Sequence, residues 1–273
     1  MHDLIIEPGE TERTYWRDLW RYRELLWFLA WRDIRVRYTQ TVLGIGWALV
    51  RPFLVVVVFT MIFNRIAHLP APGGVPYIIL VTAGLLPWQF VSSCLAECSN
   101  SVVGNASLVS KVYFPRLIIP AGSIMTSFVD FALTLAMLAL LLIGYHVAPG
   151  WRLVLLPCVI VVATANAFGA GLWLCALTAQ YRDFRHIVPF LLQFGLYVSP
   201  VGFSTTAVPD KFRGLYSLNP MVGVIDGFRS CLLPGPISVT WPSVLSSLSL
   251  GVILCASGLW YFRRMERHFA DVI

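Results

Sequence analysis

The strongest constraint on this chain is a series of long apolar blocks separated by short polar or Pro/Gly-containing segments. They cover residues 47–67, 77–99, 117–143, 153–178, 187–203 and 243–262, and the fifth is the shortest. A helix that crosses a bilayer needs about 20 apolar residues. One such block could be the core helix of a soluble protein, but six in 273 residues leave too little polar surface to cover them. The sequence therefore predicts an all-α integral membrane protein with six transmembrane helices.

Charged residues are scarce and unevenly distributed. Only 12% of the residues are charged and 58% are hydrophobic, whereas ordinary globular proteins carry roughly 25% charged residues. With the N-terminus inside, fifteen of the twenty Lys and Arg residues fall on the inner side and five on the outer side. Because cytoplasmic loops carry the Lys/Arg excess, we expect both termini in the cytoplasm. The net charge of +6 then reflects topology and attraction to anionic membrane lipids, not a nucleic-acid partner.

An aromatic stripe precedes the first block. At about 100° per residue, its members share an arc of roughly 60°: Trp16, Trp20, Trp27, Trp31, Ile34 and Tyr38. Arg17, Arg21, Arg32 and Arg35 flank this arc. We expect an amphipathic helix lying in the membrane interface, with its arginines toward phosphate and water. Arg23 falls on the stripe, so a bend near it is expected. This helix is either a simple membrane anchor or a lever that also contacts a cytoplasmic partner. The two glycines of TVLGIGW, which follows it, suit a turn of the chain into the first span.

The domain organisation follows from these blocks. Residues 1–46 form a cytoplasmic tail and the amphipathic helix, 47–262 a six-span membrane domain, and 263–273 a cytoplasmic tail. Within the membrane domain, residues 204–237 are too apolar for a plain soluble loop and too interrupted by Pro and Gly for a full span.

Five stretches, in order along nearly the whole chain, resemble type-2 ABC transporter permeases that export polysaccharides. They are WRDIRVRYTQTVLGIGWALVRP (31–52), GLLPWQFVSSCL (84–95), NASLVSKVYFPRLIIP (105–120), YRDFRHIVPFLLQFGLYVSPVGF (181–203) and LNPMVGVIDGFR (218–229). The resemblance implies an interfacial gate helix, six spans, and re-entrant helices between the fifth and sixth spans. For the gate helix it singles out Trp16, Trp20, Trp27, Trp31, Arg32, Arg35 and Arg37.

The resemblance also implies that a separate subunit binds and hydrolyses ATP. A phosphate-cradling GxxxxGK[ST] loop requires a lysine after glycine, but Lys111 and Lys211 are the only lysines and neither follows a glycine. We therefore expect no catalytic residue, metal or cofactor on this chain. In the resembled family, two permeases pair as a homodimer with two copies of a nucleotide-binding ATPase subunit, which binds ATP and Mg.

Two inner loops are candidates for contact with that ATPase. Segment 105–120 lies between the second and third spans, and Asn105 or Ser107 could cap a short helix there. By resemblance this is the coupling helix; an ordinary turn is the alternative. The second loop, 181–186, is either a further contact or a solvated charged loop, and Asp183 could pair with Arg182 or Arg185. The predicted coupling residues are Ser107, Lys111, Tyr113, Phe114, Arg116, Arg182, Asp183 and Arg185.

A channel for a sugar chain needs aromatic rings on which sugars can slide. The candidates are Trp88, Phe90, Tyr197, Phe203 and Tyr216. The alternative for each is ordinary bundle packing or an interfacial position, which is the more common role of such residues. Acidic residues in spans are usually functional or paired. Glu97 and Asp130 could pair with each other or with Arg51, and Asp226 with Arg229 one turn away.

Three functions compete. We favour an ATP-driven exporter permease that moves a lipid-linked polysaccharide across the bacterial inner membrane. Residues 35–52 look closer to O-antigen and teichoic-acid exporters than to capsule exporters, and we favour O-antigen. A membrane-embedded glycosyl or phosphoryl transferase would need clustered carboxylates, but the acids here are isolated. An ion-coupled carrier would favour two related halves, and no internal repeat is visible.

Overall fold

The computed structural model describes residues 11–39, 46–66, 68, 74–235, 239–267 and 269. Within these residues all regular secondary structure is helical, so the predicted all-α membrane class is confirmed. The glycine-containing turn expected before the first span falls mostly on residues 40–45, outside the described part of the chain.

Five helical segments are long and apolar enough to cross a membrane. They are α3 (Gly46–Thr60) with its π-helical continuation η1 (Met61–Ile66), α4 (Tyr77–Gly104), α6 (Ile118–Gly144), η3 (Trp151–Leu155) with α7 (Leu156–Gln180), and α11 (Trp241–Glu266). The remaining predicted span corresponds to the apolar helix α8 (Phe184–Val198). Its 15 residues extend about 22 Å, less than the roughly 30 Å of a bilayer core. A sixth crossing therefore stays a prediction.

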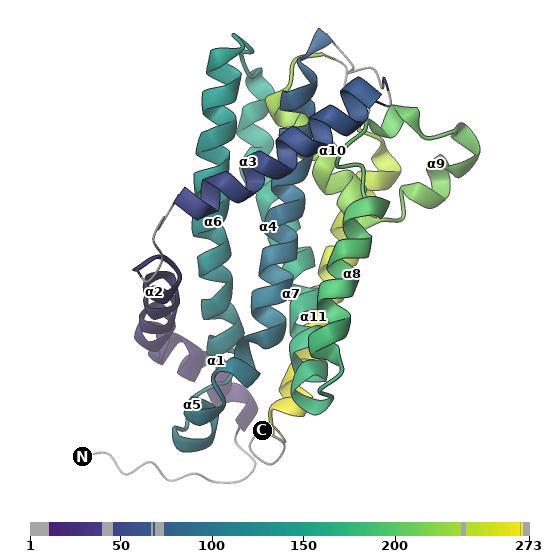
Figure 1. Ribbon diagram of the computed structural model, residues 1–273. Helices are drawn as coiled ribbons and strands as arrows, with labels where there is room; N and C mark the ends of the chain where they lie inside the picture. Colours follow the sequence, from purple (N-terminus) through teal and green to yellow (C-terminus); the bar gives the residue numbers. More distant parts are fainter. Residues whose placement is uncertain are drawn as a thin grey trace.

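The long helices form a bundle around α4. In Figure 1, α4, α6, α7 and α11 run side by side, and α3 crosses α6 and α4 obliquely. α4 packs against α6 and α7, and it is the most buried of the five candidate spans.

Small residues bring α7 and α11 into close contact. A side chain at Gly169 would overlap the backbone of Leu254 and Cys255, and one at Gly258 would overlap the carbonyl of Gly169. Close approach through small residues is how membrane helices gain packing energy when lipid is as apolar as their side chains.

One end of the bundle, called the α5 end below, gathers both described ends of the chain. α1 (Thr11–Arg21), α2 (Arg23–Thr39), the short helix α5 (Ala106–Lys111) and the end of α11 lie there (Figure 1). α1 and α2 are separated only by Tyr22, next to the bend that the sequence predicts near Arg23.

The opposite end, called the α9 end, holds the interrupted segment after α8. It contains η4 (Thr205–Ala207), α9 (Asp210–Tyr216) and α10 (Pro220–Leu232) (Figure 1). The side chain of Asn219 accepts a 2.9 Å hydrogen bond from the backbone N–H of Met221, and Pro220 occupies the first turn of α10. These residues are a favourable helix start. The expected short helices are present, but their entry into the membrane stays a prediction.

Candidate functional site

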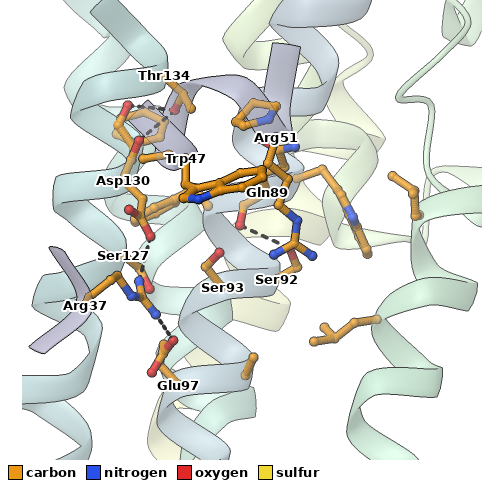
Figure 2. Close-up of a pocket in the computed structure, with 18 of the residues that line it drawn as sticks. Arg37, Trp47, Arg51, Gln89, Ser92, Ser93, Glu97, Ser127, Asp130 and Thr134 are labelled. Carbon is orange, nitrogen blue, oxygen red and sulfur yellow. Dashed lines mark hydrogen bonds and ion pairs between the residues drawn. The ribbon is translucent and has the colours of Figure 1, made fainter. Parts of the chain in front are cut away.

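A cavity of about 760 Å³ lies between five helices. The last turn of α2 and the first turns of α3 form one wall, and α4, α6 and α8 form the others. Its polar lining includes Arg37, Tyr38, Arg51, Gln89, Ser92, Ser93, Glu97, Ser127, Asp130, Thr134 and Gln193, most of which are labelled in Figure 2. Polar and ionisable groups inside otherwise apolar spans usually mark a pathway for a polar ligand.

The α4 sequence explains its polar wall. Gln89, Ser92, Ser93 and Glu97 follow one another at helical spacings, so they share one face of α4. That face turns toward the cavity (Figure 2), while Val91, Cys94 and Leu95 between these residues pack into the bundle core.

Arg37 forms ion pairs with both acidic residues of the cavity. Its Nη1 lies 2.6 Å from Asp130 Oδ2, and its Nη2 forms an ion pair with Glu97 Oε1 (Figure 2). The hydroxyl of Tyr38 donates a hydrogen bond to the other oxygen of Asp130. The pairings expected from the sequence, Glu97 with Asp130 or either with Arg51, are absent among the described residues, and Arg37 is the partner of both acids instead.

The packing of α2 on α6 explains why Arg37 is the partner. Leu29 and Ala30 are buried against Gly122 of α6, which has no side chain to hold them away. Arg37 lies seven residues beyond Ala30, and Asp130 eight residues beyond Gly122. α2 thus follows α6 for about two turns and brings Arg37 level with Asp130. The sequence reveals no such register, because it depends on how two separate helices pack.

The environment keeps these groups in the forms that pair. Burial alone would lower the pKa of Arg37, but the carboxylates of Glu97 and Asp130 raise it overall, so the guanidinium stays charged. Burial and the hydrogen bond to Asp130 raise the pKa of Tyr38, so its hydroxyl stays a neutral donor.

Arg51 contributes a second cation to the cavity. Its side chain lies beside Gln89 in Figure 2, and in the described ranges it forms no ion pair with a carboxylate. The cavity therefore offers positive charge, amides and hydroxyls beside aromatic rings, a combination suited to a polar or amphipathic ligand.

The five predicted pathway aromatics separate into three places. Trp88 and Phe90 line the cavity, and Phe90 packs against Phe131 with ring centroids 4.8 Å apart. Phe203 and Tyr216 lie together at the α9 end, with centroids 6.4 Å apart. Tyr197 is 67% exposed on α8 and does not line the cavity. Only the first pair is therefore placed where a cavity ligand could contact it.

The predicted gate-helix residues also differ in their surroundings. Trp16, Trp20, Trp27 and Trp31 are 50–72% exposed, and Arg35 lies over the ring of Trp31. Arg32 does not extend freely toward water as the flanking pattern suggests. It forms an ion pair with Asp33 and donates a 2.7 Å hydrogen bond to the side-chain oxygen of Asn105.

The first predicted coupling segment contains the expected short helix, but its residues divide into two groups. Ser107, Lys111 and Tyr113 are exposed at the α5 end. Phe114 is buried, and the backbone N–H of Arg116 donates a 2.7 Å hydrogen bond to Glu266. These last two residues make contacts within the chain, and their contact with an ATPase stays a prediction.

Two finer expectations about the inner loops are not fully met. Asn105 occupies the N-cap position of α5, but its side chain makes no capping hydrogen bond, and Ser107 lies within the helix. The Asn105 amide instead donates to Ser101 and accepts from Arg32. In the second loop Asp183 is exposed and forms no ion pair within the described residues.

Arg229 forms a buried network that the sequence only partly predicts. It lies 3.9 Å from Asp226, close to the expected pairing. Its main partners are backbone carbonyls of Leu80, Val201 and Phe203, at 2.8 to 3.3 Å. A buried cation surrounded by acceptors in this way ties α10 to α4 and to the irregular chain after α8. The signal that could have revealed it is Gly84, where any side chain would collide with the guanidinium.

Comparison with known proteins gives a consistent result. A family model described as ABC-2 type transporter matches residues 24–233. The O-antigen export system permease protein RfbA of Myxococcus xanthus is 28% identical over 260 residues, covering 94% of this chain and 98% of that protein. The protein of the same name from Klebsiella pneumoniae is 26% identical over 251 residues, or 92% and 95% of the two chains. The polysialic acid transport protein KpsM of Escherichia coli is 24% identical over 211 residues, covering 76% and 80%.

Proposed function

This chain belongs to the ABC-2 type transporter family, and we propose that it is the membrane permease subunit of an ATP-driven exporter for a lipid-linked polysaccharide of the O-antigen class. The similarity to proteins named O-antigen export permeases, over more than nine tenths of both chains, carries this proposal. Similarity to the polysialic acid transport protein covers less of each chain, which favours O-antigen over capsule polymers. Teichoic acid is the remaining alternative.

The proposal places energy coupling at the α5 end. Two copies of the permease would pair, and each would bind one ATPase subunit carrying ATP and Mg. Ser107, Lys111 and Tyr113 are exposed there and support a docking surface around α5. The chain would lie in the bacterial inner membrane with its α5 end, and with it both chain termini, on the cytoplasmic side. This orientation agrees with the Lys/Arg excess on that side.

The cavity would provide part of the polysaccharide pathway. Trp88 and Phe90 offer apolar ring surface at its wall, and Gln89, Ser92 and Ser93 offer hydrogen-bond donors and acceptors on the adjoining α4 face. Hydroxyl and amide groups exchange partners between water and sugar. Such a wall can hold a sugar chain weakly without fixing it.

Deletion and complementation test the function. Loss of the gene should remove the polysaccharide from the cell surface while full-length lipid-linked polymer accumulates at the inner face of the membrane. Restoring the gene should restore surface display. A polymer that is no longer synthesised at all would instead indicate a transferase, and unchanged surface polysaccharide would reject the exporter.

Copurification tests the partner. The tagged permease should copurify with an ATPase encoded beside it. ATP hydrolysis by the complex should require the lysine of the GxxxxGK[ST] loop in that ATPase. ATP hydrolysis by the purified permease alone would contradict the proposal that a separate subunit hydrolyses ATP.

A further inference from the structure

We propose that Arg37, Glu97 and Asp130 form an ionic latch that closes the α5 end of the cavity, and that α2 must release this latch before a polymer can pass. The ionic contacts are a property of the structure, and the closure they would produce is the first part of the proposal. The requirement for their release in export is the second part and rests on the proposed function, so the two parts are tested by separate experiments.

The latch bridges two spans at one end of the cavity. One Nη atom of Arg37 pairs with Glu97 of α4 and the other with Asp130 of α6. Glu97 is the cavity-lining residue of α4 nearest the α5 end. In Figure 2 Arg37 and Glu97 lie at one end of the labelled residues, and Asp130 lies between them and the level of Trp47 and Thr134. The guanidinium thus lies between α4 and α6 on the side of the cavity that faces the α5 end, where we place the closure.

The exposure of the latch suits a contact that opens and closes. The side chains of Arg37, Glu97 and Asp130 are 32%, 37% and 29% exposed. Water can therefore solvate each group when the pairs separate, which limits the desolvation penalty that holds a fully buried pair together. Arg229, at 1% exposure, is the contrasting case in the same chain: its contacts are permanent supports.

A mechanical connection links the latch to α5. Arg32 of α2 donates a hydrogen bond to Asn105, the residue immediately before α5. Arg37 follows five residues later on the same continuous helix, about 7.5 Å along its axis. A shift of α5 would therefore be transmitted by α2 to the latch. In this arrangement Arg37 is a positioning residue for transport, since it sets the place of α2 and need not touch the polymer.

The first experiment tests closure without any transport. A cysteine is placed at Ser93, which lines the cavity one turn beyond Glu97. A membrane-impermeant thiol reagent is added from the α5 side, and the chain with native Ser93 gives the background labelling. We compare the native latch with the uncharged triple variant Arg37→Gln, Glu97→Gln, Asp130→Asn. Removing all three charges leaves no member of the latch charged without its partner, so the variant avoids the penalty that single substitutions would incur.

The triple variant should be labelled at least fivefold faster than the native latch. The control Arg23→Gln removes an exposed charge from the start of the same helix, α2, and Arg23 has no carboxylate partner among the described residues. It should leave the rate unchanged. Equal labelling of the native latch and the triple variant, or equal acceleration by Arg23→Gln, would overturn the closure.

The second experiment tests whether α2 must move. An ideal Cβ at Gly122 lies 3.7 Å from the Cβ of Leu29, within the 3.5–4.5 Å typical of disulfides. The double variant Leu29→Cys, Gly122→Cys should therefore form a disulfide that fixes α2 on α6. Oxidation should reduce export at least tenfold and reductant should restore it, while each single cysteine variant exports under both conditions.

The outcomes separate the two proposals. Full export with the disulfide formed would overturn the requirement for α2 release, even in a protein confirmed as an exporter. If the native chain exports nothing, the proposed function fails, yet the labelling comparison still decides whether the latch closes the cavity.

Discussion

The hydroxyl of Tyr15 in α1 donates a 3.0 Å hydrogen bond to the carboxylate of Glu266, the last residue of α11. The other Glu266 oxygen accepts a 2.7 Å hydrogen bond from the backbone N–H of Arg116, and Arg263 lies over the ring of Tyr15, 4.5 Å from its centroid. Three segments far apart in sequence therefore meet around one carboxylate at the α5 end.

The first prediction concerns this junction. Tyr15→Phe removes a hydrogen bond to a charged group and should destabilise the docking of α1 by about 1–3 kcal/mol. Protease cleavage between α1 and α2 in detergent-solubilised protein should become faster. Tyr22→Phe is the matched control, because no hydrogen bond of the Tyr22 hydroxyl is found within the described residues. Equal cleavage of both variants would contradict a supporting role for the Tyr15 bond.

The second prediction concerns the buried cation at the α9 end. Arg229→Met would leave the carbonyls of Val201 and Phe203 without their donor and the carboxylate of Asp226 without its neighbouring cation. Breaking a buried charge network of this kind costs about 3–5 kcal/mol. The variant should therefore accumulate poorly in membranes and lose thermal stability in detergent.

Arg213→Met provides the control for Arg229→Met. Arg213 pairs with Asp210 on an exposed turn of α9, where an ion pair contributes little. Normal accumulation of the Arg229 variant would show that the guanidinium is not the required support.

The third prediction tests the close contact of α7 with α11. Gly169→Ala would place a methyl group against the backbone of Leu254 and Cys255. Backbone atoms cannot rotate aside as a side chain can, so the two helices must separate, at about 1–3 kcal/mol. The melting temperature in detergent should fall. Gly144→Ala, with no atom within 4 Å of its added carbon, should not lower it, and a similar fall in both variants would contradict the packing explanation.

The sequence predicts the long helices because their signal is local. Apolar length alone places α4, α6 and α11, and the arginine on the aromatic stripe indicates a break beside Tyr22. The end of α8 shows where prediction from apolar length fails. Its apolar block extends to residue 203, but the helix ends at Val198 and the chain after it is supported by Arg229.

The site is less predictable because its contacts join distant segments. Glu97 and Asp130 stand out as charges in apolar spans, yet their partner Arg37 follows only from the register of α2 against α6. Arg116 similarly resembles a surface cation until Glu266, 150 residues away in sequence, is found bonded to it. Local pattern indicates which residues need a partner, and packing decides which partner they obtain.

The last prediction concerns the ATPase contact and follows from that distinction. Lys111 and Tyr113 are exposed beside α5, so the double variant Lys111→Glu, Tyr113→Ala changes charge and apolar contact without disturbing the bundle. Its association with the ATPase should weaken at least tenfold, or about 1.4 kcal/mol, in a pull-down from solubilised membranes, while the amount of permease in the membrane stays the same.

Charge reversal at Arg116 is unsuitable for this test, because it would place a second carboxylate next to Glu266. Lys211→Glu makes the same charge change on α9 at the opposite end, and it should bind the ATPase normally. If the double variant also binds normally, the α5 surface is not the docking site.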